Sequence, residues 1–233
     1  MKLSFKSLKD HLYKNSFFGR IFHTLTYCLQ KELINCKSVL DLGCGLMSPI
    51  IYCKEIEYSV GVEAFKPYLD ESKKKKIHTE YVNKKIEELD FPDNSFDAVL
   101  LIEVLEHIPK TIGEKILKKV EKIAKKKIII TTPNGYFPMG EVDGNSFQKH
   151  LSGWSVKEFK NKGYKCRGLA GLKFFYEKEN SVESLILNTS NNDFLNIKFR
   201  YKKFFYIVNS ICQIFSYYFP IFSFEILAIK EKL

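Results

Sequence analysis

The chain has 233 residues, 45% of them hydrophobic and 15% aromatic, and its formal net charge is +10. This composition suits one globular domain, spanning 1–233, that is long enough to bury a substantial core. The six cysteines include no CxxC pair, which excludes a disulfide framework and indicates reduced thiols in a cytoplasmic protein. Residues 1–14 contain no uninterrupted apolar stretch, so no cleavable signal peptide is expected.

The positive charge comes mainly from lysine and leaves two interpretations open. A basic protein can bind nucleic acid or an anionic membrane surface. The solvated outer face of a helix explains the same residues and is favoured here, because one group of lysines recurs at helical spacing. That group comprises Lys115, Lys118, Lys119, Lys122, Lys125 and Lys126.

In chain order, the first expected elements are one or two helices within 5–35, which would form an N-terminal helical extension over 1–36. From Ser38 onward, short apolar runs rich in β-branched residues alternate with helical patterns, the clearest of which spans 111–124. Alternating strands and crossover helices predict a parallel sheet that is covered by helices on both faces. The runs predicted as strands are 38–42, 58–62, 78–83, 97–102 and 127–132, followed by a helix at about 155–162 and strands near 164–170 and 222–229.

The segment 172–221 interrupts this pattern and is interpreted as an insertion before the last strand. Its second part has no Asp, Glu, Lys or Arg from Phe204 to Phe224, a length that could span a bilayer. Asn209 and Gln213 lower its hydrophobicity, however. We therefore favour an interfacial helix or a hydrophobic substrate lid over a membrane span or a plain core helix.

The sequence "SVLDLGCG", residues 38–45, places two glycines after a predicted strand and before a predicted helix. Gly43 and Gly45 suit a tight turn with close backbone approach to a ligand. No Gly-Lys-Ser/Thr follows, which excludes a Walker loop, and Ser48 stands where a dinucleotide fingerprint needs its third glycine. Glu63 ends the second predicted strand, 20 residues after Gly43, where a carboxylate accepts hydrogen bonds from ribose hydroxyls. The pattern indicates an adenosine-containing ligand without a bulky diphosphate.

The motifs "VLDLGCG", "VGVEAF", "FPDNSFDAVLLIEVLEHIPK" and "TTPNG" occur in the order and at the spacing of class I S-adenosylmethionine-dependent methyltransferases. The chain resembles this family over about 36–170. The resemblance implies a seven-stranded Rossmann-like sheet of order 3-2-1-4-5-7-6, with strand 7 antiparallel and helices on both faces. It also implies methyl transfer with S-adenosylmethionine as the cofactor.

Within this resemblance, the glycine loop wraps the methionine part of the cofactor, Asp41 supports its amino group and Glu63 holds its ribose. The contact to adenine stays open, because Lys85 stands where the family often has Asp. Adenine is expected on the backbone of Ile86 and Glu87 or on the Glu87 side chain. The full set of residues implied in cofactor binding is Asp41, Gly43, Cys44, Gly45, Glu63, Ala64, Ile86, Glu87 and Glu103.

The motif "LLIEVLEHIPK" follows the fourth predicted strand, at the sheet edge where sites open. If its acidic part forms a helical turn, Glu103, Glu106 and His107 share one face at positions i, i+3 and i+4. Two carboxylates and an imidazole form either a general-base site or ligands of a divalent cation, and His150 is a fourth candidate downstream. The single tryptophan, Trp154, is expected to pack beneath the His150 loop.

This set resembles two branches of the family, the ubiquinone-type O-methyltransferases and the small-RNA 3′-terminal 2′-O-methyltransferases. Both pair an E-x-x-E-H turn with a later His to hold a divalent metal that orients the hydroxyl to be methylated. Glu103, Glu106, His107 and His150 match that pattern, which implies magnesium or a similar ion. Metal-free catalysis by Glu106, His107 and His150 and a purely structural role remain open alternatives.

The favoured function is methyl transfer to a hydroxyl of a small hydrophobic or lipid-linked acceptor. The protein is expected in the cytoplasm, with a peripheral membrane contact through 203–222 as one option. RNA 2′-O-methylation is the alternative within the same chemistry, although nucleic acid is the less favoured partner. A cofactor-binding partner protein without catalytic activity is a third alternative, and the oligomeric state stays open.

Overall fold

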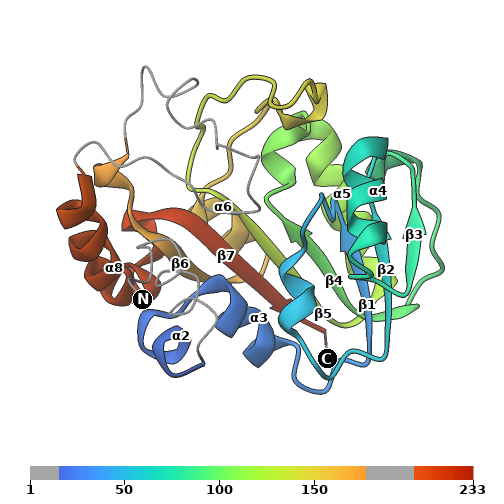
Figure 1. Ribbon diagram of the computed structural model, residues 1–233, viewed down its shortest axis with the longest axis horizontal. Helices are drawn as coiled ribbons and strands as arrows, with labels where there is room; N and C mark the ends of the chain where they lie inside the picture. The colour runs from blue at the N-terminus through green and yellow to red at the C-terminus, as the bar shows by residue number, and fades with distance from the viewer. Residues whose placement is uncertain (1–15, 177–201, 233) are drawn as a thin grey trace, which may run out of the picture.

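A computed structural model of the protein describes residues 16–176 and 202–232. Seven strands of this part form one sheet in the order β3-β2-β1-β4-β5-β7-β6 (Figure 1). Neighbouring strands from β3 to β5 are parallel, whereas β7 is antiparallel to both β5 and β6. The predicted strand order and the antiparallel seventh strand are therefore confirmed. The strands are β1 (Ser38–Leu42), β2 (Tyr58–Val62), β3 (Glu80–Val82), β4 (Phe96–Ile102), β5 (Ala124–Pro133), β6 (Lys165–Leu172) and β7 (Ser223–Glu231).

The predicted helices are present with small shifts at their ends. The part of the N-terminal extension before Ser16 and residues 177–201 of the predicted insertion lie outside the described residues. The α-helices are α2 (Ser16–Phe22), α3 (Leu25–Glu32), α4 (Lys66–Lys74), α5 (Lys110–Ile123), α6 (Val156–Asn161) and α8 (Lys202–Tyr218). Short 3-10 helices are η1 (Pro49–Tyr52), η2 (Ile86–Glu88), η3 (Leu105–His107), η4 (Ser146–Gln148), η5 (Lys173–Phe175) and η7 (Pro220–Phe222).

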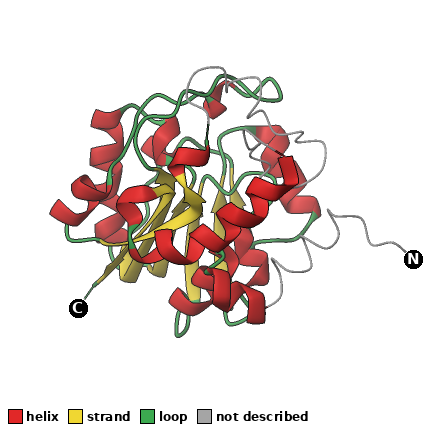
Figure 2. Ribbon diagram, turned by 90° about the vertical axis from the view of Figure 1, so that its left-hand side faces the viewer, coloured by secondary structure: helices red, strands yellow, loops and turns green. Residues whose placement is uncertain are grey.

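Helices cover both faces of the sheet, and an apolar core lies on each side (Figure 2). Helices α5 and α6 contribute to one core, whereas α3, η1 and Tyr217 of α8 contribute to the other. Within β1, Leu40 and Leu42 join the first core and Val39 joins the second, because successive side chains of a strand point to opposite faces. The sheet is therefore buried on both sides, as its nearly continuous apolar strands predict.

The glycine loop leads into η1, so the helix predicted after it is a single 3-10 turn and not an α-helix. Pro49 occupies the first position of η1, and the Ser48 side chain accepts a hydrogen bond from the N–H of Ile50. The backbone is extended again at Cys53, so the chain has room for only one turn, which a 3-10 helix fills. The same bond explains why Ser48, buried at the start of this turn, replaces a glycine.

Helix α8 occupies the second part of the predicted insertion and lies against β6, the edge strand of the sheet (Figure 1). Its Gln213 side chain donates a hydrogen bond to the carbonyl of Gly168 in β6. Among the described helices, α8 included, none combines the length and the apolarity needed to cross a membrane.

Candidate active site

The glycine loop after β1 turns through two residues of left-handed backbone. Gly43 has φ +73° and Gly45 has φ +57°, values that residues with a side chain rarely adopt. A Cβ atom on Gly43 would lie 2.5 Å from Cγ2 of Val104, so this glycine also lets the end of β4 pack against the loop. Between the two glycines, Cys44 is buried and its N–H donates to the carbonyl of Val62. The predicted tight turn is present.

Glu63 at the end of β2 holds this loop from the opposite side. Its Oε2 accepts a hydrogen bond from the N–H of Gly45 at 3.1 Å, and its Oε1 accepts one from Phe65 at 2.7 Å. Burial raises the pKa of Glu63, and these N–H groups oppose the shift by favouring the charged form. Asn83, which no sequence signal identified, donates to the carbonyls of Glu63 and Ala64 and ties β2 to the end of β3.

Asp41 in β1 has a partner that the sequence analysis missed. Its Oδ2 lies 2.9 Å from Nε2 of His78, and both side chains are buried. Gly61 provides the space, because a Cβ atom there would lie 2.8 Å from Nδ1 of His78. The amino-group support that the resemblance implies for Asp41 therefore involves a carboxylate whose orientation His78 fixes.

The residues predicted to contact adenine follow β3, the strand at one end of the sheet. Ile86 and Glu87 form η2, and Lys85 precedes it with its Nζ 5.9 Å from the ring centroid of Phe147. Phe147 belongs to the loop 134–155 between β5 and α6. This loop therefore reaches over the carboxyl ends of the strands towards the side of β3.

A second contact fixes the same loop to α4. The Tyr68 hydroxyl donates to Oδ2 of Asp143 at 3.0 Å. At its other end the loop is anchored to η3, because the N–H groups of Leu151 and Ser152 both donate to the carbonyl of Glu106. The loop therefore connects the half of the edge predicted for the cofactor with the half that carries Glu106.

Glu103 does not share a helical turn with Glu106 and His107, and that expectation was wrong. Glu103 has φ +53°, and η3 begins only at Leu105. The cause is a pair of bonds to β5: the N–H of Glu103 donates to the carbonyl of Thr131, and the Thr131 hydroxyl donates to Oε1 of Glu103 at 2.8 Å. These bonds hold Glu103 at the strand end and turn the chain abruptly into η3.

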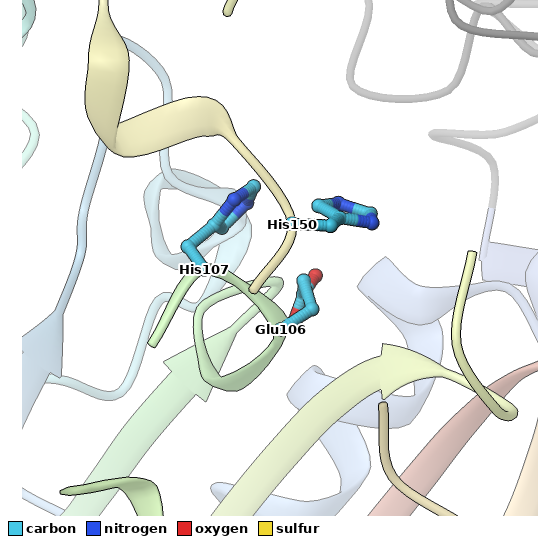
Figure 3. Close-up of side chains that lie close together, drawn as sticks. All are labelled: Glu106, His107 and His150. Atoms are coloured by element: carbon cyan, nitrogen blue, oxygen red, sulfur yellow. The ribbon is translucent and has the colours of Figure 1, made fainter. Parts of the chain in front are cut away.

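Three of the four predicted chemical residues do come together. Glu106 and His107 of η3 and His150 of the loop 134–155 offer ligand atoms that all lie within 4.8 Å of one another (Figure 3). The rings of His107 and His150 have centroids 4.8 Å apart, and the Glu106 carboxyl group points towards His150 (Figure 3). Trp154 is fully buried beneath this loop and donates to the carbonyl of Leu105, as expected.

Both imidazoles are held as neutral rings. Nδ1 of His150 donates to the carbonyl of Phe137, and Nδ1 of His107 lies 3.4 Å from the carbonyl of Lys149. Since a carbonyl only accepts, these contacts place the proton on Nδ1 and leave Nε2 with a free lone pair. Burial lowers the pKa of His150, and burial together with the charge of His150 lowers the pKa of His107 to about 3.

Buried carboxyl groups form the floor of this site. Neither oxygen of Glu106 has a hydrogen-bond partner among the described residues, and the same is true of Oε1 of Glu225 in β7. Burial and the charge of Glu103 raise the pKa of Glu106 and of Glu225 well above the usual range. Glu225 was missed by the sequence analysis, although it is the one acidic residue within the apolar run "SFEILAI".

Comparison with known proteins gives the following matches. Residues 40–131 match the family model described as a methyltransferase domain. The uncharacterized protein MJ0638 of Methanocaldococcus jannaschii is 32% identical over 133 residues, which cover 54% of this chain and 54% of that protein. The chain therefore spans about half the length of this curated relative.

Two solved structures are similar over nearly the whole chain. A SAM-dependent methyltransferase from Archaeoglobus fulgidus is 17% identical with a TM-score of 0.52, covering 93% of this chain and 98% of that one. The methyltransferase domain of bacterial CtHen1-CN is 20% identical with a TM-score of 0.49, covering 94% and 100%.

The sheet order and the Archaeoglobus likeness show the Rossmann-like methyltransferase fold. Within this fold, residues 40–131 match the methyltransferase-domain model. Together these findings support a class I S-adenosylmethionine-dependent methyltransferase, with S-adenosylmethionine as its cofactor.

Proposed function

We propose that the protein methylates a hydroxyl group of a small hydrophobic or lipid-linked acceptor, in the manner of the ubiquinone-type O-methyltransferases that its sequence resembles. The observation that carries the proposal is the group formed by Glu106, His107 and His150. A hydroxyl is a poor nucleophile until it loses its proton, so its methylation needs a base or a cation, whereas a neutral amine already has a nucleophilic lone pair.

A divalent cation fits this group. The two buried oxygens of Glu106 lack partners among the described residues, and the two imidazoles are neutral with Nδ1 turned to backbone carbonyls. Ligating histidines in proteins adopt this arrangement, with the second ring nitrogen donating to a carbonyl. Glu106, His107 and His150 would hold the ion. When bound, a cation such as Mg²⁺ lowers the pKa of a coordinated hydroxyl and orients it.

In the alternative without a cation, the ionised form of Glu106 would accept the hydroxyl proton, because burial raises its pKa and makes it a stronger base than an ordinary carboxylate. The low pKa of His107, about 3, makes it a weak base and favours a ligand role. S-adenosylmethionine, when bound, would supply the activated methyl group, and this group of residues would position the acceptor hydroxyl and help it to lose its proton. The rate then depends on in-line alignment and on the exclusion of water.

Aromatic side chains beside His150 support an apolar acceptor. The carbonyl of Phe137 receives the Nδ1 proton of His150, and the Phe137 ring lies edge-on to Phe224 with centroids 5.2 Å apart. Tyr176 stacks on the other side of Phe224 at 3.8 Å. These packed rings lie beside the carbonyl that receives the His150 proton, and an aromatic acceptor next to them would find offset or edge contacts.

The test is turnover of methyl-labelled S-adenosylmethionine with Mg²⁺ and three acceptors: catechol, a catechol that carries a long alkyl tail, and a short single-stranded RNA. We expect methylation of the tailed catechol, with catechol itself a poorer substrate. Glu106→Gln should reduce turnover by about 100-fold or more, as loss of a general base does. Glu114→Gln, on the exposed face of α5, is the matched control and should leave turnover unchanged. Methylation of RNA with both catechols unmodified would overturn the acceptor class in favour of the RNA alternative.

A further inference from the structure

Helix α8 turns polar side chains towards the protein interior and apolar side chains outward. Within 207–218, every exposed residue of this helix is apolar or aromatic, and three of the four buried ones are polar. A helix on a protein surface ordinarily places its apolar side chains inward and its polar side chains in water. The exposed residues recur at the spacing of one helical stripe; they are Ile207, Ile211, Ile214, Phe215 and Tyr218.

The inward polar residues are engaged and fix the rotation of α8 about its axis. Asn209 accepts a hydrogen bond from the N–H of Leu172 and donates to the carbonyl of Ala170. Gln213 accepts one from the N–H of Gly171 and donates to the carbonyl of Gly168. These bonds satisfy the backbone of β6 where its register with β7 shifts.

Close packing excludes another orientation as well. A Cβ atom on Gly168 would lie 2.1 Å from the carbonyl oxygen of Ser216, so the backbones of β6 and α8 are in direct contact there. Turning the helix to bury its apolar stripe would break these amide bonds and leave buried backbone groups unpaired. The stripe therefore faces outward in the folded protein.

The apolar stripe continues into the turn after α8 and reaches the active-site edge. Phe215 stacks on Phe219 with ring centroids 4.6 Å apart, and Ile221 and Phe222 of η7 are more than half exposed. The Asn134 side chain, at the end of β5, donates to the carbonyls of Pro220 and Ile221. The exposed apolar residues of α8 and η7, which we call the outer face, therefore begin beside the strand ends that carry the site.

Within the described elements α2, η5, α8 and η7, the charged residues are all basic. Helix α2, which contacts α8, exposes Phe17 and Ile21 together with Arg20. In η5, Phe174 is 83% exposed beside the exposed Lys173. The sequences of α2, η5, α8 and η7 contain no Asp or Glu, and the whole chain has a net charge of +10.

We infer that the outer face docks the protein onto the surface of a lipid bilayer with anionic headgroups. Aromatic and branched apolar side chains flanked by cations are what an interfacial helix presents to a headgroup region. Among the described helices none is long enough to cross the bilayer, so α8 lies along the surface. Docking in this orientation brings the active-site edge next to the lipid. Such docking does not depend on which hydroxyl is methylated.

The experiment is flotation of the full-length protein with vesicles of phosphatidylcholine, alone or mixed with phosphatidylglycerol. We expect binding to the mixed vesicles, weaker binding to phosphatidylcholine alone, and weakening by added salt. The double variant Ile211→Ser/Phe215→Ser should lose at least tenfold in binding to the mixed vesicles. Ile34→Ser, which removes an exposed apolar residue outside the outer face, is the matched control and should bind as the wild type does.

Two measurements keep this test separate from folding and from the proposed reaction. The double variant should keep the wild-type affinity for S-adenosylhomocysteine and the wild-type turnover of a soluble acceptor, which shows that it is folded and active. Equal vesicle binding by the wild type and the double variant would overturn the inference. Failure of the wild type to bind either kind of vesicle would also overturn it. If the wild type then sediments as a dimer that the double variant disrupts, the outer face binds a second copy of the chain.

Discussion

The two halves of the active-site edge differ in how their buried carboxyl groups are paired. In the cofactor half, formed by β1 to β3, Asp41 is paired with His78, and both oxygens of Glu63 accept backbone hydrogen bonds. In the acceptor half, formed by β4, β5 and β7, buried oxygens of Glu106 and Glu225 have no partner among the described residues. Burying a polar group costs free energy unless it is paired. The cofactor half is therefore organised by the protein itself, whereas Glu106 retains its full capacity for a ligand.

The largest predicted effect is on metal affinity, and it tests whether Glu106 is available to a ligand. Glu106→Gln keeps the shape of the side chain and removes its charge, so the affinity for Mn²⁺ or Mg²⁺ measured by calorimetry should fall by about 100-fold or more. Loss of a residue that only hydrogen-bonds to a metal ligand already lowers metal affinity by about 10- to 100-fold. S-adenosylhomocysteine affinity should change less than threefold. A Glu106→Gln variant with the metal affinity of the Glu114→Gln control would remove Glu106 from any ligand set.

The second prediction tests the cofactor half. Glu63→Ala removes the carboxylate that accepts from Gly45 and, by the resemblance, from the ribose, so S-adenosylhomocysteine affinity should fall by about 1.5–3 kcal/mol, the range for hydrogen bonds to charged groups. Metal affinity should stay within threefold of the wild type, since the two halves use different residues. Unchanged calorimetric affinity for S-adenosylhomocysteine would exclude Glu63 from the pocket.

The third prediction concerns pH. The pKa of His107 is lowered to about 3 and that of His150 is lowered too, which favours neutral rings that add little pH dependence. Burial and the charge of Glu103 raise the pKa of Glu106, so binding of a cation would displace a proton from its protonated form. Metal affinity should therefore rise with pH, by up to about tenfold per unit until Glu106 is ionised. Calorimetry in two buffers of different ionisation enthalpy should detect the released proton. A rise with a midpoint near the usual histidine pKa that persists in Glu106→Gln would assign the proton to an imidazole instead.

The sequence predicts the fold well because the fold depends on local patterns. Apolar runs with helical patterns between them define the parallel sheet, and the Gly43 and Gly45 turn follows from glycines alone. Four lysines of the predicted helical group lie on α5, whereas Lys125 and Lys126 lie in β5, so the helical spacing extended too far. In helix α8 the same inference fails, because the polar residues Asn209 and Gln213 lie inward. They are hydrogen-bonded to a bulged strand that only the tertiary structure reveals.

The site is predictable where neighbours in sequence are neighbours in space. Glu106 and His107 adjoin on η3, and the later His150 completes the group as expected. Glu103 departs from the expectation because its position depends on Thr131, a residue of the adjacent strand, and not on helical spacing. Glu225 lies in β7, an antiparallel strand far downstream in the sequence, and no local pattern indicates that it joins this site.

The smallest predicted effect is on the loop that connects the two halves. Tyr68→Phe removes the hydroxyl that donates to Asp143 and so frees one end of the segment that carries His150. Because this hydrogen bond is exposed, the free energy of unfolding should fall by about 0.5 kcal/mol, the low end for a hydrogen bond. Urea unfolding measures that loss, and Tyr27→Phe, on α3, is the matched control. If the loop transmits order between the halves, S-adenosylhomocysteine should tighten metal binding in the wild type and do so less in Tyr68→Phe; equal coupling in both proteins would mean that the two halves act independently.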